Sequence, residues 1–303
     1  MNNNTIAALI LTKNEAKHIE RCINSLKGVC DEVIVVDSFS TDNTCGLAEK
    51  LGAKVYKNPW KNYATQFNYG VYHCNIQSEW IWRIDADEFL EGNLGKAMKK
   101  ALKDCEDDVN GVYVRKRIDF MNRSLLHGGW YPSYHLKVFR REHGDCENRW
   151  MDEHIRIFDG CTITVDDGNQ VDANLNDLTW WTDKHNGYAT REMVDMLMMQ
   201  YGLDAKAQEV IPKFFGTEEQ RKRWLKIKYI KSPLFVRPFI NFIWRYILKG
   251  GFLDGKEGFI WHILQGFWYR MLVDAKIYEI KKRFNYNEEE IKNYLKDNYL
   301  TKY

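Results

Sequence analysis

Two carboxylates one residue apart, Asp85 and Asp87, follow the short and mostly apolar run Trp80–Ile84. An apolar run of this length predicts a buried strand. Carboxylates held where such a strand ends are costly to bury unless a cation lies nearby. Hard divalent ions bind oxygen ligands, and Mg²⁺ commonly takes one or two carboxylates together with phosphate oxygens. The pattern predicts a divalent-cation site for a phosphorylated substrate, and a solvated acidic turn is the alternative for this segment alone.

Polar clusters also follow two earlier apolar runs, at Thr12–Glu15 and at Asp37–Asp42. In an open α/β sheet, ligands bind beside the carboxyl ends of the strands. The chain has no Gly-x-Gly-x-x-Gly motif, so a glycine-rich turn is not expected to hold phosphate. The carboxylate of Asp37 can instead accept hydrogen bonds from a base N–H or a ribose hydroxyl. A turn or helix-capping aspartate is the structural alternative.

The apolar pattern predicts the elements that carry these clusters. Strands that alternate with helices of about 10–15 residues indicate βαβ units and a mostly parallel sheet. Such units cross over right-handed, so helices are expected on both faces. The predicted fold is therefore α/β. Strands are expected at 5–12, 32–37, 54–57, 80–85, 111–121 and 134–140, and helices at 19–26, 40–51, 62–73, 95–103 and 183–200.

Charge is distributed unevenly along the 303 residues. Residues 212–303 hold 19 Lys and Arg against 10 Asp and Glu, whereas the rest of the chain holds 25 against 32. The basic part is also rich in aromatic residues. An acidic body joined to a basic part indicates two surfaces with different partners, for which nucleic acid and an anionic membrane are the usual choices. No nucleic-acid motif is visible, so no nucleic-acid partner is expected.

Two apolar stripes in the basic part predict amphipathic helices on either side of the break Lys249–Gly255. Helices with Lys and Arg on one face and Trp, Phe and Leu on the other are typical of the membrane interface. Packing of the stripes on the catalytic domain is the alternative. The stripes are Phe235, Phe239, Phe242, Ile243, Tyr246 and Ile247, and then Ile260, Ile263, Leu264, Phe267, Trp268 and Met271.

The predicted location is cytoplasmic, peripheral at the inner face of the cytoplasmic membrane. No stretch reaches the ~18 apolar residues expected of a membrane span, and the N-terminus has no signal-peptide pattern. Seven cysteines without a Cys-x-x-Cys pair are expected to be free thiols in a reducing compartment.

The order and spacing of the three polar clusters resemble the N-terminal half of an inverting family 2 glycosyltransferase of the GT-A fold. The likeness is closest to bacterial enzymes that build lipopolysaccharide core and O-antigen chains, and it covers about two thirds of the chain. It implies a catalytic domain at 1–205, with a nucleotide-sugar half at about 1–108 and an acceptor half at about 109–205. Residues 206–303 would then form a helical region at the membrane or the lipid acceptor.

The resemblance also implies roles for single residues. Thr12, Asn14 and Glu15 would line the nucleotide pocket. Asp37 would contact the uracil or ribose, and Asp85 the ribose side of the donor. Asp87 would bind a Mg²⁺ or Mn²⁺ ion that bridges the diphosphate, where a divalent ion stabilises the charge left on the β-phosphate.

Inversion needs a general base that takes the proton of the acceptor hydroxyl. In the family this is an acidic residue well downstream, and Glu153 and then Asp152 are the candidates here, although their order departs from the commoner Glu-Asp pair. Turn carboxylates are the alternative. Some GT-A enzymes carry a late histidine that completes metal or diphosphate binding. His185 is the candidate for that role, with a structural histidine as its alternative, and Lys184 is the candidate for offsetting the diphosphate charge.

The predicted activity is metal-dependent, β-linkage-forming transfer of a hexosyl group from a UDP-sugar. The acceptor would be a hydroxyl of a lipid-linked or oligosaccharide glycan in lipopolysaccharide or O-antigen synthesis. One alternative is a sugar-nucleotide nucleotidyltransferase, but the glycine-rich basic loop usual there is absent from Ile10–Glu15. Another is a non-enzymatic protein that binds the membrane surface, which leaves the acidic strand ends unexplained.

Overall fold

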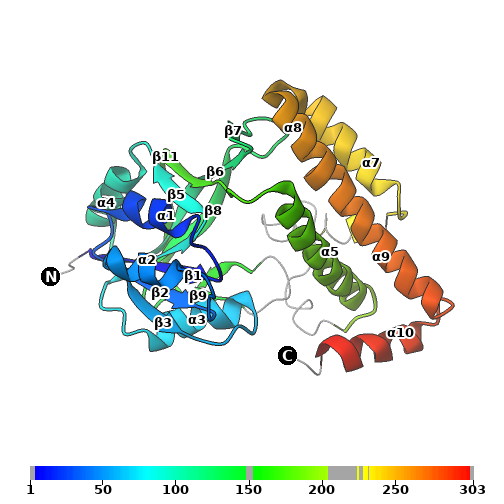
Figure 1. Ribbon diagram of the computed structural model, residues 1–303, viewed down its shortest axis with the longest axis horizontal. Coiled ribbons are helices and arrows are strands. Elements are labelled where there is room, and N and C mark those ends of the chain that lie inside the picture. Colours follow the sequence, from blue (N-terminus) through cyan, green and yellow to red (C-terminus); the bar gives the residue numbers. More distant parts are fainter. Residues whose placement is uncertain (1–3, 148–152, 204–223, 225–227, 231, 301–303) are drawn as a thin grey trace. The chain divides into compact units, whose positions relative to one another are not determined.

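The computed structural model describes residues 4–147, 153–203, 224, 228–230 and 232–300. The chain forms two compact units, Met1–Leu175 and Asn176–Tyr303, and Figure 1 shows both. The first unit is α/β and the second is helical in its described residues. The division falls earlier in the chain than the boundary at residue 205 proposed from the sequence. Helix α5 (Leu178–Gln200) therefore belongs to the second unit.

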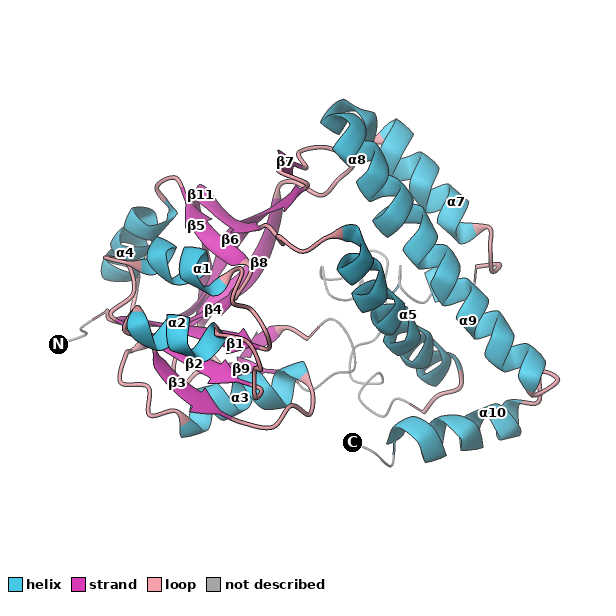
Figure 2. Ribbon diagram, in the orientation of Figure 1, coloured by secondary structure: helices cyan, strands magenta, loops and turns pink. Residues whose placement is uncertain are grey.

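A single large sheet organises the first unit (Figure 2). Within the described residues its strands follow the order β3-β2-β1-β4-β8-β6-β11-β5, and β7 pairs with β6 at one side. The half from β3 to β4 is parallel, whereas β8 runs antiparallel to both of its neighbours. The strands are β1 (Ile6–Thr12), β2 (Glu32–Asp37), β3 (Lys54–Lys57), β4 (Trp80–Asp85), β5 (Glu88–Glu91), β6 (Val109–Phe120), β7 (Arg123–Ser124), β8 (Ser133–Arg140) and β11 (Cys161–Asp172).

The remaining elements of this unit connect and cover the sheet. Two short strands, β9 (Gly144–Cys146) and β10 (Ile155–Ile157), form a separate antiparallel pair. The helices are α1 (Ile19–Leu26), α2 (Thr44–Lys50), α3 (Tyr63–His73) and α4 (Leu94–Asp104).

The strands of the parallel half lie where their apolar runs predict them. Strand β5 and strand β11 were not predicted. Strand β5 is only four residues long and starts directly after the Asp85–Asp87 turn. Strand β11 carries polar residues in its middle, where its register with β6 shifts between Val165 and Gln170. Neither segment shows the continuous or alternating apolar pattern from which a strand is recognised.

Side chains of the strands alternate between two cores, one on each face of the sheet. On β1, Ile6, Ala8 and Ile10 pack on the face covered by α1 and α4, whereas Ala7 and Leu9 pack on the face covered by α3. All five are fully buried. This is the period-two alternation of a strand buried on both faces. Burying each large apolar side chain contributes about 1.5–3 kcal/mol.

Helix α3 lies close to the parallel strands because it carries Gly70 on its inner face. A Cβ atom at this position would lie 2.6 Å from Leu9 Cδ1 and 3.1 Å from Val36 Cγ2. Ala64 and Phe67, on the same helix, are fully buried in this core. The close approach fixes the first turn of α3, and with it Tyr63, above the strand face.

The second unit is helical in the residues that the structure describes. After α5 come α7 (Arg237–Phe242), which continues into the π-helical turn η2 (Ile243–Leu248), and the 3-10 turn η3 (Gly251–Asp254). Then α8 (Gly255–Trp261), η4 (His262–Trp268) and α9 (Tyr269–Arg283) form one continuous helix (Figure 1). Last come α10 (Glu288–Leu295) and η5 (Lys296–Leu300).

A buried ion pair joins two helices of this unit. Arg237 at the start of α7 and Asp274 in α9 are 3% and 0% exposed, and Arg237 Nε donates to Asp274 Oδ1 at 2.7 Å. The other carboxylate oxygen of Asp274 accepts the N–H of Phe235 at 2.8 Å. Removing one partner of such a pair typically costs about 3–5 kcal/mol, because the other charge is then buried alone.

Candidate active site

The carboxyl ends of three adjacent parallel strands bring Thr12, Asp37 and Asp85 together. Strand β1 lies between β2 and β4, with Thr12 opposite Asp37 and Leu11 opposite Asp85. The side-chain hydroxyl of Thr12 donates to Asp37 Oδ2 at 2.8 Å. The sequence therefore placed these residues correctly at one edge of the sheet, which is where ligands bind in an α/β fold.

Asp37 is held as a carboxylate by donors from its own loop. The N–H of Ser40 donates to Asp37 Oδ1 at 2.8 Å, and the Ser40 hydroxyl donates to Oδ2 at 2.5 Å. Burial favours the protonated form, but these bonds and that of Thr12 outweigh it and lower the pKa of Asp37. The carboxylate is thus ionised at neutral pH although it is fully buried beneath its loop.

The loop after β1 is tied to the loop after β2. Lys13 Nζ donates to the carbonyls of Ser38 and Phe39 at 2.7 and 2.6 Å, and Asn14 Oδ1 accepts the N–H of Thr41 at 2.8 Å. Asn14 and Phe39 both adopt positive φ, at 57° and 58°. Non-glycine residues in this region carry strain that their surroundings must hold in place, and such residues cluster at functional sites.

The carboxylate of Glu15 contacts His18 within the first unit. Its Oε2 lies 2.6 Å from His18 Nδ1, and His18 Nε2 accepts the N–H of Leu175 at 2.9 Å. Because Nε2 accepts from a backbone N–H, the proton of the neutral ring is on Nδ1 and is donated to Glu15. The described contacts of Glu15 therefore orient His18 and the end of the segment after β11.

Asp87 lies in the turn between β4 and β5, and two chain segments hold this turn. Asn174 Nδ2 donates to Asp87 Oδ2 at 2.9 Å, and the N–H of Ala173 donates to the Asp87 carbonyl at 3.2 Å. Arg21 Nη2, from α1, donates to the same carbonyl at 3.0 Å. The turn is therefore built from α1 and from the segment that follows β11, both far away in the sequence.

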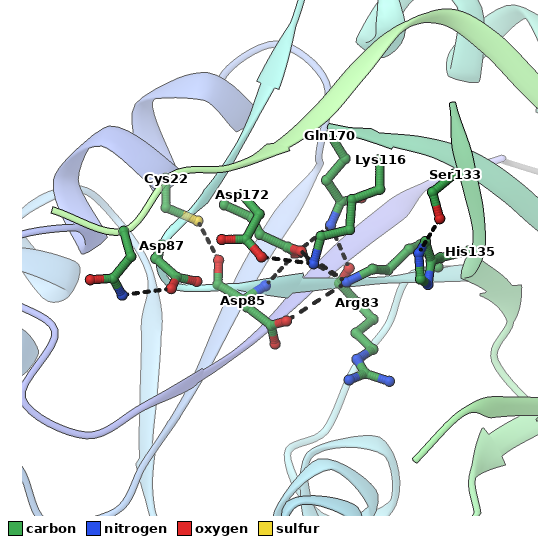
Figure 3. A network of polar contacts seen from close by, with 12 residues as sticks. Cys22, Arg83, Asp85, Asp87, Lys116, Ser133, His135, Gln170 and Asp172 are labelled. Carbon is green, nitrogen blue, oxygen red and sulfur yellow. Dashed lines mark hydrogen bonds and ion pairs between the residues drawn. The ribbon is translucent and has the colours of Figure 1, made fainter. Parts of the chain in front are cut away.

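Glu88 is fully buried behind this turn. It belongs to a network of polar contacts that includes Asp85, Lys116, Gln170 and Asp172, which Figure 3 labels. Its Oε2 accepts the backbone N–H of Asp85 at 2.9 Å and a bond from Gln170 Nε2 at 2.5 Å. Lys137 Nζ and Lys116 Nζ each lie 3.1 Å from the Glu88 carboxylate. Glu88 therefore begins strand β5 and anchors the turn that precedes it.

The charges of this network balance one another. Lys116 Nζ also lies 2.9 Å from Asp172 Oδ2, and Lys137 Nζ lies 3.7 Å from Asp85 Oδ2. Burial favours the protonated form of Asp85, but the charges of Lys137 and Arg83 outweigh it. They hold the pKa of Asp85 well below its usual range. Asp85 is therefore ionised without depending on a bound ligand.

The carboxylates of Asp85 and Asp87 would suit a divalent cation that takes its remaining ligands from substrate and water. Among the residues the structure describes, no group of three or more His, Cys, Asp or Glu side chains is placed to hold an ion. Asp85 and Asp87 nevertheless offer carboxylate oxygens at one strand end. Mg²⁺ in phosphate-transfer sites commonly takes one or two carboxylates and obtains its other ligands from phosphate and water.

A hydrogen-bonded path connects Asp85 with Glu153. The hydroxyl of Tyr63 donates to Asp85 Oδ1 at 2.6 Å and accepts from Arg83 Nε at 2.8 Å. Arg83 Nη1 donates to the main-chain carbonyl of Glu153 at 3.0 Å. Arg83, which lies on β4 two residues before Asp85, thus fixes the segment that carries Glu153, the first candidate base. Asp152, the second candidate, lies outside the described residues.

Lys184 and His185 belong to α5 in the second unit, which begins five residues before the predicted helix because Asp177 caps it. Lys184 Nζ lies 4.5 Å from the centre of the Trp180 ring. His185 stacks on Trp181 at 3.5 Å, and its Nδ1 donates to the Trp181 carbonyl at 2.8 Å. Burial lowers the pKa of His185 to about 4, so the ring is neutral at pH 7 with its lone pair on Nε2.

Sequence reasoning missed the cations and the tyrosine that support the acidic residues. Arg83 stands inside the mostly apolar strand Trp80–Asp85, and Lys137 stands in the buried part of Ser133–Arg140, next to Val138 and Phe139. A charged residue in a buried strand is expected to have a partner. The presence of Arg83 and Lys137 in buried strand segments was therefore the sequence signal that these strands contain ion pairs. The pairings themselves depend on strand order, which the sequence did not show for β8 and β6.

Strand-end carboxylates of a parallel half-sheet, continued by a mixed half, define an α/β protein with a candidate ligand site at the carboxyl ends of its strands. The chain belongs to glycosyl transferase family 2, whose family model matches residues 8–159. The resemblance seen in the three polar clusters is thereby confirmed, and glycosyl transfer is the class of activity.

Curated relatives cover most of the chain. An uncharacterized glycosyltransferase of Rickettsia felis is 53% identical over 264 residues, which are 84% of this chain and 83% of that protein. The lipopolysaccharide core biosynthesis glycosyltransferase LpsC of Rhizobium meliloti is 25% identical over 288 residues, 90% of this chain and 92% of that protein. The chain is thus similar to a lipopolysaccharide glycosyltransferase along nearly its whole length.

A solved structure has the same fold. It is that of the mannosyltransferase PcManGT from Pyrobaculum calidifontis in complex with GDP-Man and Mn²⁺. It matches with a TM-score of 0.51 and 15% identity, and covers 90% of this chain and 86% of that one. The α/β fold predicted from the sequence, of the GT-A type, is confirmed.

Proposed function

We propose that this glycosyltransferase moves a hexosyl group from a UDP-sugar to a hydroxyl of a glycan acceptor, with inversion and formation of a β-linkage. The observation that carries the proposal is the meeting of Thr12, Asp37 and Asp85 at the ends of three adjacent parallel strands. Two ionised carboxylates at such an edge suit the ribose and base of a nucleotide, since they accept hydrogen bonds from hydroxyl and N–H groups.

In this proposal, Asp37 accepts a hydrogen bond from the uracil or ribose, and Thr12 keeps the carboxylate oriented through its 2.8 Å bond. Asn14 shapes the rim of the pocket, because its amide oxygen fixes the start of the loop at Thr41. Glu15 acts on the pocket through His18. Asp85 contacts the ribose side of the donor.

Asp87 is the proposed ligand of Mn²⁺ or Mg²⁺ at the donor diphosphate. When bound, the cation offsets the negative charge that develops on the leaving diphosphate. The chain's own contribution is the placement of the Asp87 carboxylate, which Asn174 and Arg21 secure through contacts with the turn. That a fold relative was solved with GDP-Man and Mn²⁺ supports a nucleoside-diphosphate sugar and a divalent cation as the pair to test.

Glu153 is the proposed general base, with Asp152 as the second candidate. An acidic side chain within hydrogen-bonding reach of the acceptor hydroxyl would take its proton as the bond to the sugar forms. Arg83 contacts Glu153 through its main-chain carbonyl and so fixes the segment that carries the proposed base.

The proposed acceptor is lipid-linked, and an apolar surface of the second unit supports contact with the inner membrane face. Exposed apolar residues at helical spacing form a stripe on α7 and η2, which we call the exposed stripe: Ile240, Ile243, Trp244, Ile247 and Leu248. They are 62%, 47%, 52%, 53% and 66% exposed. Apolar patches of this kind on a protein surface mark sites of association.

A basic residue borders the exposed stripe, as expected for an anionic membrane. Lys249 Nζ lies 5.3 Å from the centre of the Trp244 ring. An amphipathic helix with these two features lies in the interface of an anionic bilayer. Among the described residues, no helix has both the length and the apolarity required to cross a bilayer.

Part of the predicted stripes packs inside the second unit. Phe239 and Phe242 contact Phe267 with ring centres 4.8 and 6.1 Å apart, and Tyr246 contacts Phe259 at 5.6 Å. The two predicted apolar faces therefore meet each other in part, so packing accounts for some of their apolar residues. The similarity to LpsC supports an acceptor in lipopolysaccharide or O-antigen synthesis.

A nucleotide-release screen tests the proposal directly. The purified enzyme is incubated with Mn²⁺ and a panel of UDP-sugars, with GDP-mannose as the competing donor, and release of UDP or GDP is measured with and without membrane-lipid extract. The proposal expects UDP release that increases with the extract and stops with EDTA. Release from GDP-mannose alone would contradict the donor, and equal release with EDTA would contradict the metal.

A further inference from the structure

Tyr63 occupies a position between the donor side and the acceptor side of the candidate site. It stands in the first turn of α3, and its hydroxyl uses both of its hydrogen-bonding capacities. It donates to Asp85 Oδ1 at 2.6 Å and accepts from Arg83 Nε at 2.8 Å. A hydroxyl with both a donor and an acceptor role fixed in this way is held in one orientation.

Arg83 extends the contact to the candidate base. Its guanidinium lies over the Tyr63 ring, 4.3 Å from the ring centre, and 6.0 Å from that of Phe67. Nη1 of the same group donates to the Glu153 carbonyl at 3.0 Å. A planar guanidinium presents its donors in a fixed fork, so the direction of one bond determines that of the other. The orientation of Arg83 on Tyr63 therefore determines where the Glu153 main chain is held.

The surroundings make this path rigid. Tyr63 and Phe67 stack with ring centres 6.3 Å apart at 11°, and Phe67 is fully buried against the sheet. Gly70 lets α3 approach the strands closely. Burial opposes the charge of Arg83, but Tyr63 and Asp85 outweigh it and raise its pKa, so the guanidinium remains charged.

We propose that Tyr63 is a positioning residue, which acts through Arg83 to hold the base-bearing segment at Glu153 in register with the donor-side carboxylate Asp85. The inference rests on the proposed function, because it takes Glu153 as the base and Asp85 as a donor contact. It adds a physical connection between the two halves of the reaction. A donor that contacts Asp85 therefore also affects the Tyr63 hydroxyl, which is bonded to Asp85 and orients Arg83.

The expected consequence is a loss of turnover without a comparable loss of donor affinity. Tyr63→Phe keeps the ring under Arg83 and removes only the hydroxyl. Asp85 retains the charges of Lys137 and Arg83, so the donor Kd is expected to change less than about threefold, the effect of a weak hydrogen bond. Misplacement of the base is expected to lower kcat by about tenfold to a hundredfold. Tyr69→Phe, on the same helix, is the matched control and should keep the wild-type kcat.

A double-mutant cycle with Glu153→Gln distinguishes positioning of the base from a general structural effect. If Tyr63 acts through Glu153, Tyr63→Phe lowers kcat strongly in the wild type and hardly at all in the Glu153→Gln background. Equal losses in both backgrounds, or no loss in either, would overturn the inference. Arg83→Lys keeps the charge but cannot make both bonds, and should reproduce the kcat loss of Tyr63→Phe.

The single variants separate failure of this inference from failure of the proposed function. Glu153→Gln with wild-type kcat would refute Glu153 as the base, and the positioning role with it. A low kcat for Glu153→Gln together with additive losses would leave the base in place and refute only the role of Tyr63. The donor Kd, measured by calorimetry with UDP and Mn²⁺, is determined for every variant, and melting temperatures identify any variant that fails to fold.

Discussion

Glu88 Oε2 accepts the backbone N–H of Asp85 at 2.9 Å, so the first residue of β5 holds the last residue of β4. The hydrogen bond from Asp85 to Glu88 therefore closes the acidic turn that joins the two strands. Glu88 is fully buried and takes its counter-charges from Lys116 and Lys137. Of the three acids in this short segment, Glu88 is thus fully buried, whereas Asp85 and Asp87 lie at the edge of the sheet.

Glu88→Gln should destabilise the enzyme and disturb the turn. An amide cannot offset the two lysines, which would remain near Glu88's position as buried cations. The expected loss is about 3–5 kcal/mol in the free energy of unfolding, typical of breaking a buried pair. Urea unfolding of the purified variant measures it. Glu142→Gln, at an exposed acid of the same unit, is the control, and an equal midpoint for all three proteins would disprove the anchoring role.

Asp87→Asn should abolish metal-dependent transfer while the fold is retained. The substitution keeps the size of the side chain but replaces one carboxylate oxygen of a hard-cation ligand with an amide nitrogen. Turnover is expected to fall by about a hundredfold or more, as for loss of a group that stabilises transition-state charge. The control is Asp166→Asn, an exposed acid of β11. Substantial turnover of Asp87→Asn with Mn²⁺ and donor would exclude Asp87 as the ligand.

Glu153→Gln should lower kcat by about a hundredfold or more and leave UDP binding nearly unchanged, because general-base catalysis typically contributes 10²–10⁴-fold. The bond from Arg83 goes to the main chain, so the variant keeps its place on β4. Steady-state kinetics and UDP titration measure the two effects separately. Glu147→Gln is a control from the same region, and a wild-type rate for Glu153→Gln would move the role to Asp152 or elsewhere.

Charges placed in the exposed stripe should weaken membrane binding and leave the chemistry intact. The pair Ile243→Glu and Ile247→Glu removes about 3 kcal/mol or more of apolar burial in a bilayer, an effect of at least about a hundredfold on partitioning. Co-sedimentation with anionic liposomes measures binding. Met121→Glu, at a 50% exposed apolar residue of the first unit, is the matched control. Equal sedimentation of both variants would refute the membrane proposal.

The second unit should lose stability as the pH falls from 6.5 towards 4. His262 is fully buried, and neither ring nitrogen has a hydrogen-bond partner among the described residues. Burial, and then Arg245, lower its pKa from 6.5 to about 4, while Asp254 opposes this. The unfolded state therefore binds more protons in this window. A single such group reduces the free energy of unfolding by about 2 kcal/mol at pH 5.

His262→Leu should make stability less dependent on pH between 7 and 5, and His73→Leu, at an exposed histidine, should not. The measurement is the urea midpoint at both pH values. An unchanged pH dependence in His262→Leu would show that other groups cause the acid sensitivity. Carboxylates with lowered pKa lose their contribution in acid as well, so the comparison between variants isolates the histidine.

The sequence by itself determined the parallel half of the sheet and the residues at its edge. Apolar runs such as Trp80–Asp85 and Glu32–Asp37 define strands because a strand buried on both faces needs continuous apolar side chains. The polar residues that end these runs then lie at one edge, since parallel strands all end in the same direction. Thr12, Asp37 and Asp85 could be placed for this reason, and the family could be recognised from their spacing.

Only the tertiary structure decided which charges support that edge. Glu88 is contacted by Lys116, Lys137 and Gln170, which lie on three strands of the mixed half. No local sequence pattern predicts the order of these strands. Tyr63 and Arg83 are joined because α3 packs on the face of β4 that carries Asp85. A pattern along the chain reports which side chains must be buried. Which of them meet depends on strand order and on helix packing, and these arise only when distant segments come together.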